Sequence, residues 1–170
     1  MNIQYRPIQI KDNQAVKELI QNVFVEFDAP REGTVFADPD MEDLYGLFER
    51  TSKSVFWIAE ASGEILGCCG VYPTEGLPRE VAELVKFYLA PSSRGKGIGK
   101  ALLKKCTESA QELGFKSLYI ESIPEFENAI GLYKRQGFRR LDQPLGDSGH
   151  FTCTIWMLKE LSPAVSIAID

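Results

Sequence analysis

The stretch Arg94-Gly95-Lys96-Gly97-Ile98-Gly99 follows the apolar segment 81–89 and opens the periodic run 98–113. This order predicts a strand, a glycine loop and a helix. The three glycines lack Cβ atoms and permit positive φ angles, so consecutive backbone N–H groups can converge on an anion at the start of the helix. Several lysines stand nearby in a chain whose net charge is −5, so the positive charge is local. The stretch predicts a loop that binds a diphosphate.

Two common phosphate loops do not fit this stretch. The dinucleotide fingerprint GxGxxG requires a third glycine where Lys100 stands. A Walker A loop aligned on Gly99-Lys100 would have Arg94 in place of its first glycine and Ala101 in place of the Ser or Thr that holds magnesium. The remaining pattern, [Q/R]xxGx[G/A], resembles the coenzyme A loop of the GNAT (GCN5-related N-acetyltransferase) superfamily. The alternative is a glycine-rich turn that only lets a strand pack tightly on a helix.

One carboxylate interrupts the apolar segment 81–89. Strand periodicity places the odd positions on one face: Val81, Glu83, Val85, Phe87 and Leu89. Burial disfavours the charged form of a carboxyl group, so Glu83 is expected to have a raised pKa and to accept a proton near neutral pH. The alternative is that Glu83 reaches solvent or pairs with Arg79 or Lys86. In the histone-acetyltransferase-like branch of the superfamily, the general-base glutamate has the same spacing to the loop as Glu83 has to Arg94.

The segment 128–138 predicts a short helix that ends at Gly137 and is followed by a strand. It is similar to the second GNAT signature, A-x-x-x-Y-x-x-x-G-F. The resemblance implies that Tyr133 points at the thioester sulfur and protonates the departing thiolate, whereas the alternative is a tyrosine buried for packing. Many members of the superfamily have a pantetheine-binding asparagine where this chain has Phe126. Asn128 lies about 200° further around a helix and is not expected to replace it.

The resemblance also implies a fold and a reaction. The fold is α/β (α+β), with a mixed central sheet of about seven strands flanked by about four helices. The reaction is direct transfer of the acetyl group of acetyl-CoA to a primary amine of a small molecule or peptide, with Glu83 as general base and Tyr133 as general acid. Where the Glu83 strand splays from its neighbour, the backbone of Phe87 and Leu89 would contact the cosubstrate. Its diphosphate would bind the loop residues: Arg94, Gly95, Lys96, Gly97, Ile98 and Gly99.

The pattern of apolar residues along the chain predicts the element order β-α-α-β-β-β-α-β-α-β-β. Strands are expected to include the segments 55–59, 65–72, 118–121 and 151–158. The segment 61–64 is expected to form a hairpin turn. His150 lies in a glycine-containing turn before the last strand, in a region that borders the acceptor pocket in the superfamily; the other reading is an exposed turn histidine.

Composition limits the remaining possibilities. With 170 residues and 44% hydrophobic content, we expect one domain over residues 1–161, and the segment 162–170 as a loose tail or an arm that contacts a partner, which leaves a homodimer open. The absence of a signal peptide and of a long apolar stretch predicts a cytoplasmic protein without membrane contact. Four cysteines without CxxC spacing and a single histidine argue against a metal site. A pI of about 5.1 without a basic tract argues against nucleic-acid binding.

Two other functions are alternatives to an acetyltransferase. A non-catalytic module that binds or senses acyl-CoA would keep the loop without turnover, and the presence of both Glu83 and Tyr133 argues against it. A nicotinamide oxidoreductase would need a proper fingerprint and an acidic ribose-binding residue about 20 residues beyond it. No sequence pattern identifies the amine acceptor.

Overall fold

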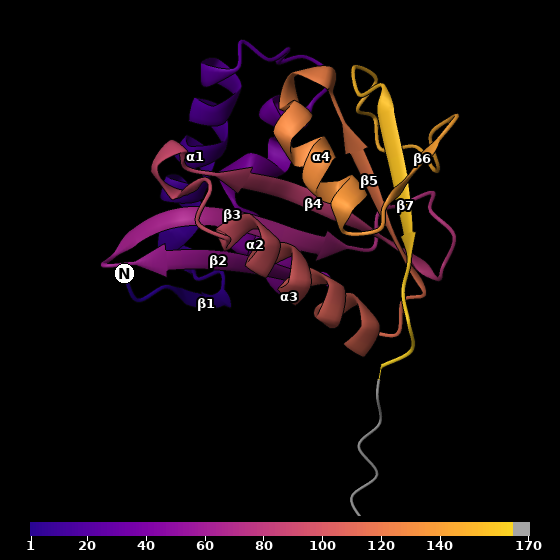
Figure 1. Cartoon of the computed structure of the whole chain (residues 1–170), viewed down its shortest axis with the longest axis horizontal. Helices are drawn as coiled ribbons and strands as arrows, with labels where there is room; N and C mark the ends of the chain where they lie inside the picture. Colours follow the sequence, from indigo (N-terminus) through magenta and orange to yellow (C-terminus); the bar gives the residue numbers. More distant parts are fainter. Residues whose placement is uncertain (165–170) are drawn as a thin grey trace, which may run out of the picture.

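The computed structural model describes residues 1–164 and contains one seven-stranded sheet with helices on both faces (Figure 1). The strand order is β1-β2-β3-β4-β5-β7-β6, and all neighbours are antiparallel except β4 and β5. The strands are β1 (Gln4–Pro7), β2 (Val55–Ala61), β3 (Glu64–Tyr72), β4 (Val81–Leu89), β5 (Ser117–Ser122), β6 (Arg139–Leu141) and β7 (Ile155–Glu160). The helices are α1 (Asn13–Glu26), α2 (Leu44–Arg50), α3 (Ile98–Glu112) and α4 (Glu127–Arg135). The predicted α/β fold and element order are confirmed.

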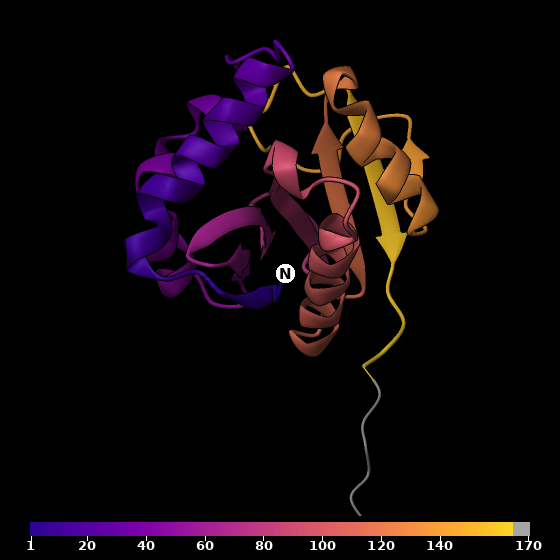
Figure 2. The same cartoon turned by 60° about the vertical axis from the view of Figure 1, so that its left-hand side comes forward.

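Each face of the sheet is covered by its own pair of helices. Figure 2 shows α1 and α2, in indigo and purple, on one side and α3 and α4 on the other. The apolar stripe of α1, which includes Val16, Ile20 and Phe24, packs with α2 against one face. Leu102 and Leu103 of α3 pack against the other face together with α4. We call these the α1–α2 core and the α3–α4 core.

A bulge in β4 changes which of its residues share a face. The register pairs Gly70 with Val85 but Cys68 with Tyr88, so β4 contains one residue more than β3 between these pairs. Val85 therefore packs with the α1–α2 core, whereas Phe87 and Leu89 pack with the α3–α4 core. The prediction that all odd positions from Val81 to Leu89 lie on one face is wrong beyond Val85, because the bulge reverses the alternation.

The parallel pair β4 and β5 separates after three paired positions. The last pair joins Glu83 to Tyr119, although β4 continues to Leu89 and β5 to Ser122. Figure 1 shows the two strands diverging. The predicted splay is confirmed, and Glu83 lies at its apex.

The segment before β7 does not form the strand predicted for 151–158, since β7 begins at Ile155. The hydroxyl group of Thr152 instead donates a hydrogen bond to the carbonyl oxygen of Glu32 at 2.7 Å, and its N–H group donates to the carbonyl oxygen of Gly33 at 3.2 Å. These bonds hold the β6–β7 connection against the loop that follows α1. Of the predicted tail, residues 165–170 lie outside the described part. None of the helices within residues 1–164 has the length and apolar composition of a membrane span.

Candidate active site

A cleft of about 1130 Å³ opens where β4 and β5 separate. Its lining includes most of the predicted site residues: Glu83, Phe87, Leu89, Arg94, Gly95, Gly97, Gly99 and Tyr133. Lys96 and Ile98 do not line it, because the side chain of Lys96 is exposed and that of Ile98 is buried in the α3–α4 core. The fold thus brings the predicted catalytic pair and the glycine loop to one cleft.

The three glycines of the loop have different roles. Gly95 and Gly97 have φ angles of +72° and +78°, and a Cβ atom on either would meet no heavy atom within 4 Å. Both positions therefore require glycine for their backbone conformation and leave open space beside it. A Cβ atom on Gly99 would lie only 3.0 Å from a methyl carbon of Leu89 and 3.1 Å from the Phe87 ring. The alternative, a glycine needed only for tight packing of α3 on β4, therefore accounts for Gly99 but not for Gly95 or Gly97.

The start of α3 presents free backbone donors. Gly97 is the N-cap of the helix and has no side chain to cap it, and the first backbone bond of the helix runs from the N–H of Ala101 to the carbonyl oxygen of Gly97 at 3.0 Å. The N–H groups that precede Ala101 in the first turn therefore have no acceptor within the helix. Together with the helix dipole, they make the start of α3, next to the open space at Gly95 and Gly97, favourable for binding an anion.

The side chain of Arg94 is held by α1 in this structure. Its guanidinium group pairs with Glu26, with Nη1–Oε1 and Nη2–Oε2 distances of 2.5 and 2.8 Å, and lies 5.1 Å from the ring centroid of Phe27. It also donates a hydrogen bond to the carbonyl oxygen of Leu89 at 3.1 Å. The hydrogen bond from Arg94 lowers the pKa of Glu26. Arg94 therefore connects the glycine loop to the end of α1.

Glu83 is buried at the apex of the splay, with 4% of its surface exposed. The hydroxyl group of Thr74 donates a hydrogen bond to its Oε1 at 3.3 Å. Burial raises the pKa of Glu83 to about 7, and the negative charge of Glu121 adds to the rise, whereas the charges of His150 and Lys86 oppose it. A carboxyl group that titrates near neutral pH can take up and release a proton under ordinary conditions.

Tyr133 lies on α4 with its ring between two other aromatic side chains. The ring centroids of Phe87 and Phe138 are each 5.8 Å away. Burial raises the pKa of the Tyr133 hydroxyl group well above its usual value, so the group is protonated at neutral pH. As predicted, α4 is followed by Gly137 in a left-handed conformation with φ +92°.

Phe126 forms an aromatic wall where the superfamily often has asparagine. Its ring makes edge-on contacts with Phe24, Phe27 and Tyr88, at centroid distances of 5.2, 5.9 and 5.8 Å. Asn128 also lines the cleft. Phe126 belongs to a 3-10 turn before α4, so the angle of a regular helix does not describe its relation to Asn128; that Asn128 does not replace the asparagine stays a prediction.

A charged cluster beside Glu83 was not predicted as a unit. Asp38 contacts two basic side chains: its Oδ1 lies 2.7 Å from His150 Nε2, and its Oδ2 lies 3.0 Å from Lys86 Nζ. All three side chains line the cleft. Burial opposes protonation of His150, but the hydrogen bond and charge of Asp38 outweigh it and raise its pKa. Asp38 and His150 are 112 positions apart, and no sequence spacing indicated their contact. His150 is thus partly buried and ion-paired rather than an exposed turn residue.

No group of three or more His, Cys, Asp and Glu side chains among residues 1–164 is arranged to hold a metal ion. The four cysteines are free and buried, and Cys68 and Cys69 face the α1–α2 and α3–α4 cores respectively.

Comparison with known proteins assigns the family. Residues 16–138 match the acetyltransferase (GNAT) family. The Escherichia coli (strain K12) protein named Uncharacterized N-acetyltransferase YjgM is 36% identical over 157 residues, which cover 92% of this chain and 93% of the relative. An acetyltransferase of the GNAT family from Staphylococcus aureus Mu50 has a similar structure, with a TM-score of 0.82 at 22% identity over 95% of this chain and all of the other.

A phosphinothricin acetyltransferase from Sinorhizobium meliloti, solved in complex with AcCoA, has a TM-score of 0.74 at 21% identity over 95% of this chain and 90% of the other. The sequence-based predictions of the family and of an acyltransferase are confirmed. The chain belongs to the acetyltransferase (GNAT) family.

Proposed function

We propose that the protein transfers the acetyl group of acetyl-CoA directly to a primary amine, with Glu83 as general base and Tyr133 as general acid. The observation that carries this proposal is the buried Glu83, whose pKa is about 7, at the apex of the β4–β5 splay. The glycine loop with the unbonded N–H groups of α3 lies at the other end of the same cleft. The complex of the Sinorhizobium meliloti neighbour with AcCoA supports acetyl-CoA as the donor.

Each group has a defined task in this reaction. The N–H groups at the start of α3 bind the diphosphate, and the backbone of β4 beyond Glu83, at Phe87 and Leu89, faces the pantetheine arm. A primary amine is mostly protonated at neutral pH, so Glu83 removes its proton before the nitrogen attacks the thioester carbonyl. As the carbon–sulfur bond breaks, Tyr133 donates a proton to the sulfur. We further propose that Phe87 N–H polarises the carbonyl group.

A test of the function itself needs no variant. Acetyl-CoA is incubated with a panel of amines, polyamines, amino acids and peptides, and the release of free thiol is followed together with the mass of the acetylated product. Turnover that depends on an amine supports the proposal. Tight binding of acetyl-CoA without amine-dependent thiol release across the panel would favour the non-catalytic acyl-CoA module.

Tyr133→Phe is expected to lower kcat about tenfold or more while folding and acetyl-CoA affinity are retained. The substitution keeps the ring between Phe87 and Phe138 and removes only the hydroxyl group. Steady-state kinetics with single-turnover controls measures the effect. Wild-type turnover under conditions in which chemistry limits the rate would show that Tyr133 only packs.

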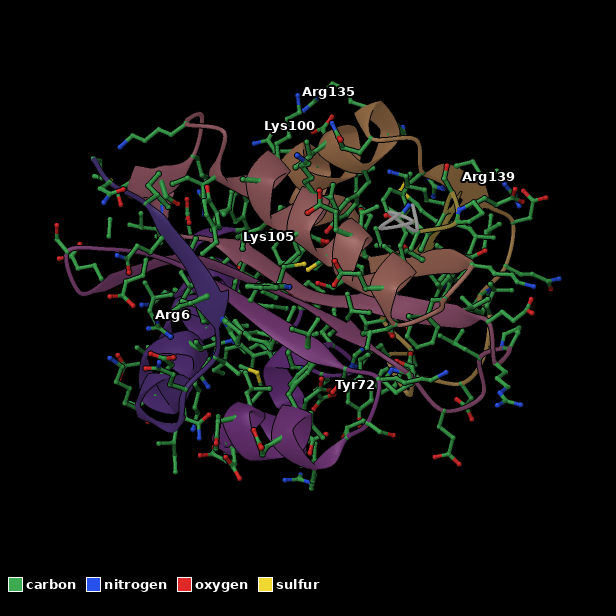
Figure 3. The ribbon with its side chains drawn as sticks, turned by 90° about the horizontal axis from the view of Figure 1, so that it is seen from below. Arg6, Tyr72, Lys100, Lys105, Arg135 and Arg139 are labelled. Atoms are coloured by element: carbon green, nitrogen blue, oxygen red, sulfur yellow. The ribbon has the colours of Figure 1, made fainter. Side chains whose placement is uncertain are left out.

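Two cations at the α3–α4 edge of the cleft are expected to recognise the 3′-phosphate of acetyl-CoA. Arg94, Lys86 and His150 are paired with carboxylates, whereas within residues 1–164 Lys100 and Arg135 have no carboxylate within 4.0 Å. Figure 3 shows these two side chains at the same edge of the molecule. Gly131 leaves room for Arg135, since a Cβ atom there would lie 3.2 Å from its Nη1.

Arg135→Gln is therefore expected to raise the KM for acetyl-CoA about tenfold and to have less effect with acetyl-dephospho-CoA, because a charge-assisted bond to phosphate is lost. Arg139→Gln is the matched control, since Arg139 is exposed on β6 and does not line the cleft. An equal effect of Arg135→Gln on both donors would contradict recognition of the 3′-phosphate.

A further inference from the structure

Three charged side chains from distant parts of the chain meet at the Glu83 end of the cleft. Asp38 comes from the loop after α1, Lys86 from β4 and His150 from the β6–β7 connection. Asp38 binds the other two through separate carboxylate oxygens, Oδ1 to His150 and Oδ2 to Lys86. We call these residues the Asp38 cluster. It lies close enough to Glu83 for the charges of Lys86 and His150 to act on that carboxyl group.

The backbone of Lys86 is strained in a way that brings its side chain to this place. Its φ angle is +52°, a left-handed conformation in which the Cβ atom of a non-glycine residue is crowded by the backbone. Regular alternation would put Lys86 and Glu83 on opposite faces of β4. The bulge instead turns Lys86 toward Asp38, where only 8% of its side chain is exposed. Strain of this kind is concentrated at functional sites.

The Asp38 cluster has more positive charge and more donors than its own contacts use. Within residues 1–164, Asp38 is the single carboxylate within 4.0 Å of either Lys86 or His150. One carboxylate therefore faces two cations when His150 is protonated. Lys86 has three N–H donors and uses one on Asp38, and His150 uses only Nε2. Two cations and one carboxylate within contact distance leave one positive charge without a partner in the Asp38 cluster, together with unused N–H donors at the wall of the cleft.

The neighbouring wall has the opposite charge. Glu83 and Glu121 both line the cleft, and Glu121 already accepts hydrogen bonds from the hydroxyl groups of Tyr119 and Ser148. A positive site and a negative site thus lie near each other on the wall of the cleft. This arrangement complements a molecule that has an ammonium group and an anionic group close together.

Building on the proposed function, we propose that the acceptor is a free amino acid, with its carboxylate bound by Lys86 and His150 and its amino group next to Glu83. The new bond joins the amino nitrogen to the acetyl carbon as the carbon–sulfur bond breaks. The ammonium group loses two protons: Glu83 takes the first, and the second replaces the proton that Tyr133 gives to the departing sulfur. The product is an N-acetylamino acid that keeps its carboxylate. A polyamine would bring a second cation against the Asp38 cluster, and the terminus of a peptide would bring a neutral amide.

The first test compares matched acceptors on the wild-type protein. Each amino acid of a panel is assayed beside its carboxamide and its decarboxylated amine, for example leucine, leucinamide and 3-methylbutylamine, with spermidine and a capped peptide as further arms. We expect kcat/KM for the preferred amino acid to exceed that of its amide and amine by about 10²-fold or more, because the analogues leave buried donors unpaired. The amide has the more easily deprotonated amine, so amine basicity works against this result.

The second test removes the cations singly. Lys86→Met and His150→Gln are each expected to raise the KM for the amino acid about tenfold or more and to narrow its advantage over the amide. Lys104→Met is the matched control, because Lys104 is exposed on α3 and does not line the cleft. Affinity for CoA and the melting temperature show whether each variant is folded.

The outcomes separate this inference from the proposed function. Amides, amines or peptides that react as well as the free amino acids would overturn the amino acid acceptor and leave the acetyltransferase intact. The inference would also be overturned if folded Lys86→Met and His150→Gln variants both keep the full preference for the free amino acid over its amide. Absence of transfer to every compound would overturn the proposed function and this inference with it.

Discussion

Glu83→Gln is expected to lower kcat at pH 7 by about 10²-fold or more and at the same time to make the protein more stable. The loss of activity follows because glutamine cannot accept the proton of the amine. The defect should shrink as pH rises, since more of the amine is then already deprotonated. Steady-state rates between pH 6 and 10 measure both effects. An unchanged pH–rate profile would show that another group or water takes the proton.

The gain in stability follows from the pKa of Glu83. Its pKa is raised from 4.5 to about 7 in the folded protein, so between these values the folded state binds more protons than the unfolded state. The free energy of unfolding of the wild type therefore falls as pH rises through this window, by up to about 3 kcal/mol. Glutamine has no such penalty. Denaturant unfolding at pH 4 and pH 8 should show the variant's advantage only at pH 8.

Glu121→Gln provides a control for this assignment. The negative charge of Glu121 contributes to the raised pKa of Glu83, so its removal should shift the acidic limb of the pH–rate profile to lower pH. The shift distinguishes Glu83 as the titrating base from a group elsewhere in the cleft. If the acidic limb of the pH–rate profile does not move, the rate does not depend on the ionisation of Glu83.

Gly97→Val is expected to weaken CoA binding about 10²-fold or more. The new side chain would occupy the open space beside Gly97, where the diphosphate must approach the N–H groups of α3. Calorimetric titration with CoA measures the effect. Unchanged affinity in a folded variant would remove the basis for the diphosphate site.

The matched control for Gly97→Val is Gly114→Val. Gly114 also has a positive φ angle, +87°, and a Cβ atom there would likewise meet nothing within 4 Å, but it follows the far end of α3. Both variants should lose stability through backbone strain, whereas only Gly97→Val should lose CoA affinity. A similar loss of affinity in both would attribute the effect to strain in α3.

The fold was predictable because the residue pattern of most segments favours the same secondary structure that the fold requires of them. The hairpin after β2 illustrates this, since Ser62 and Gly63 both have positive φ angles, as a tight two-residue turn requires. The glycine loop and the turn at Gly137 were readable for the same reason. Each depends on a residue type that a specific backbone conformation demands.

Two parts of the site were not predictable from sequence periodicity. The bulge at Lys86 arises where β4 must satisfy both the register of β3 and the ion pair with Asp38, and a lysine gives no local sign of a positive φ angle. The Asp38 cluster depends on loops that meet only after folding. The strand predicted for 151–158 begins only at Ile155, because the backbone before β7 bonds to the loop at Gly33, and this long-range contact has no local sequence signal.

The ion pair between Arg94 and Glu26 bears on how readily the glycine loop can bind a diphosphate. The pair is partly exposed, with 30% and 37% of the two side chains accessible, so its contribution to stability is about 0–1 kcal/mol. If a diphosphate takes Arg94 from Glu26, affinity is reduced by at most about fivefold through breaking the pair. The ion pair also restricts the guanidinium group to one orientation beside the loop, and such pre-organisation lowers the entropy lost on binding. The carboxylate of Glu26 thus binds Arg94 weakly, in the way that a phosphate group of the ligand would.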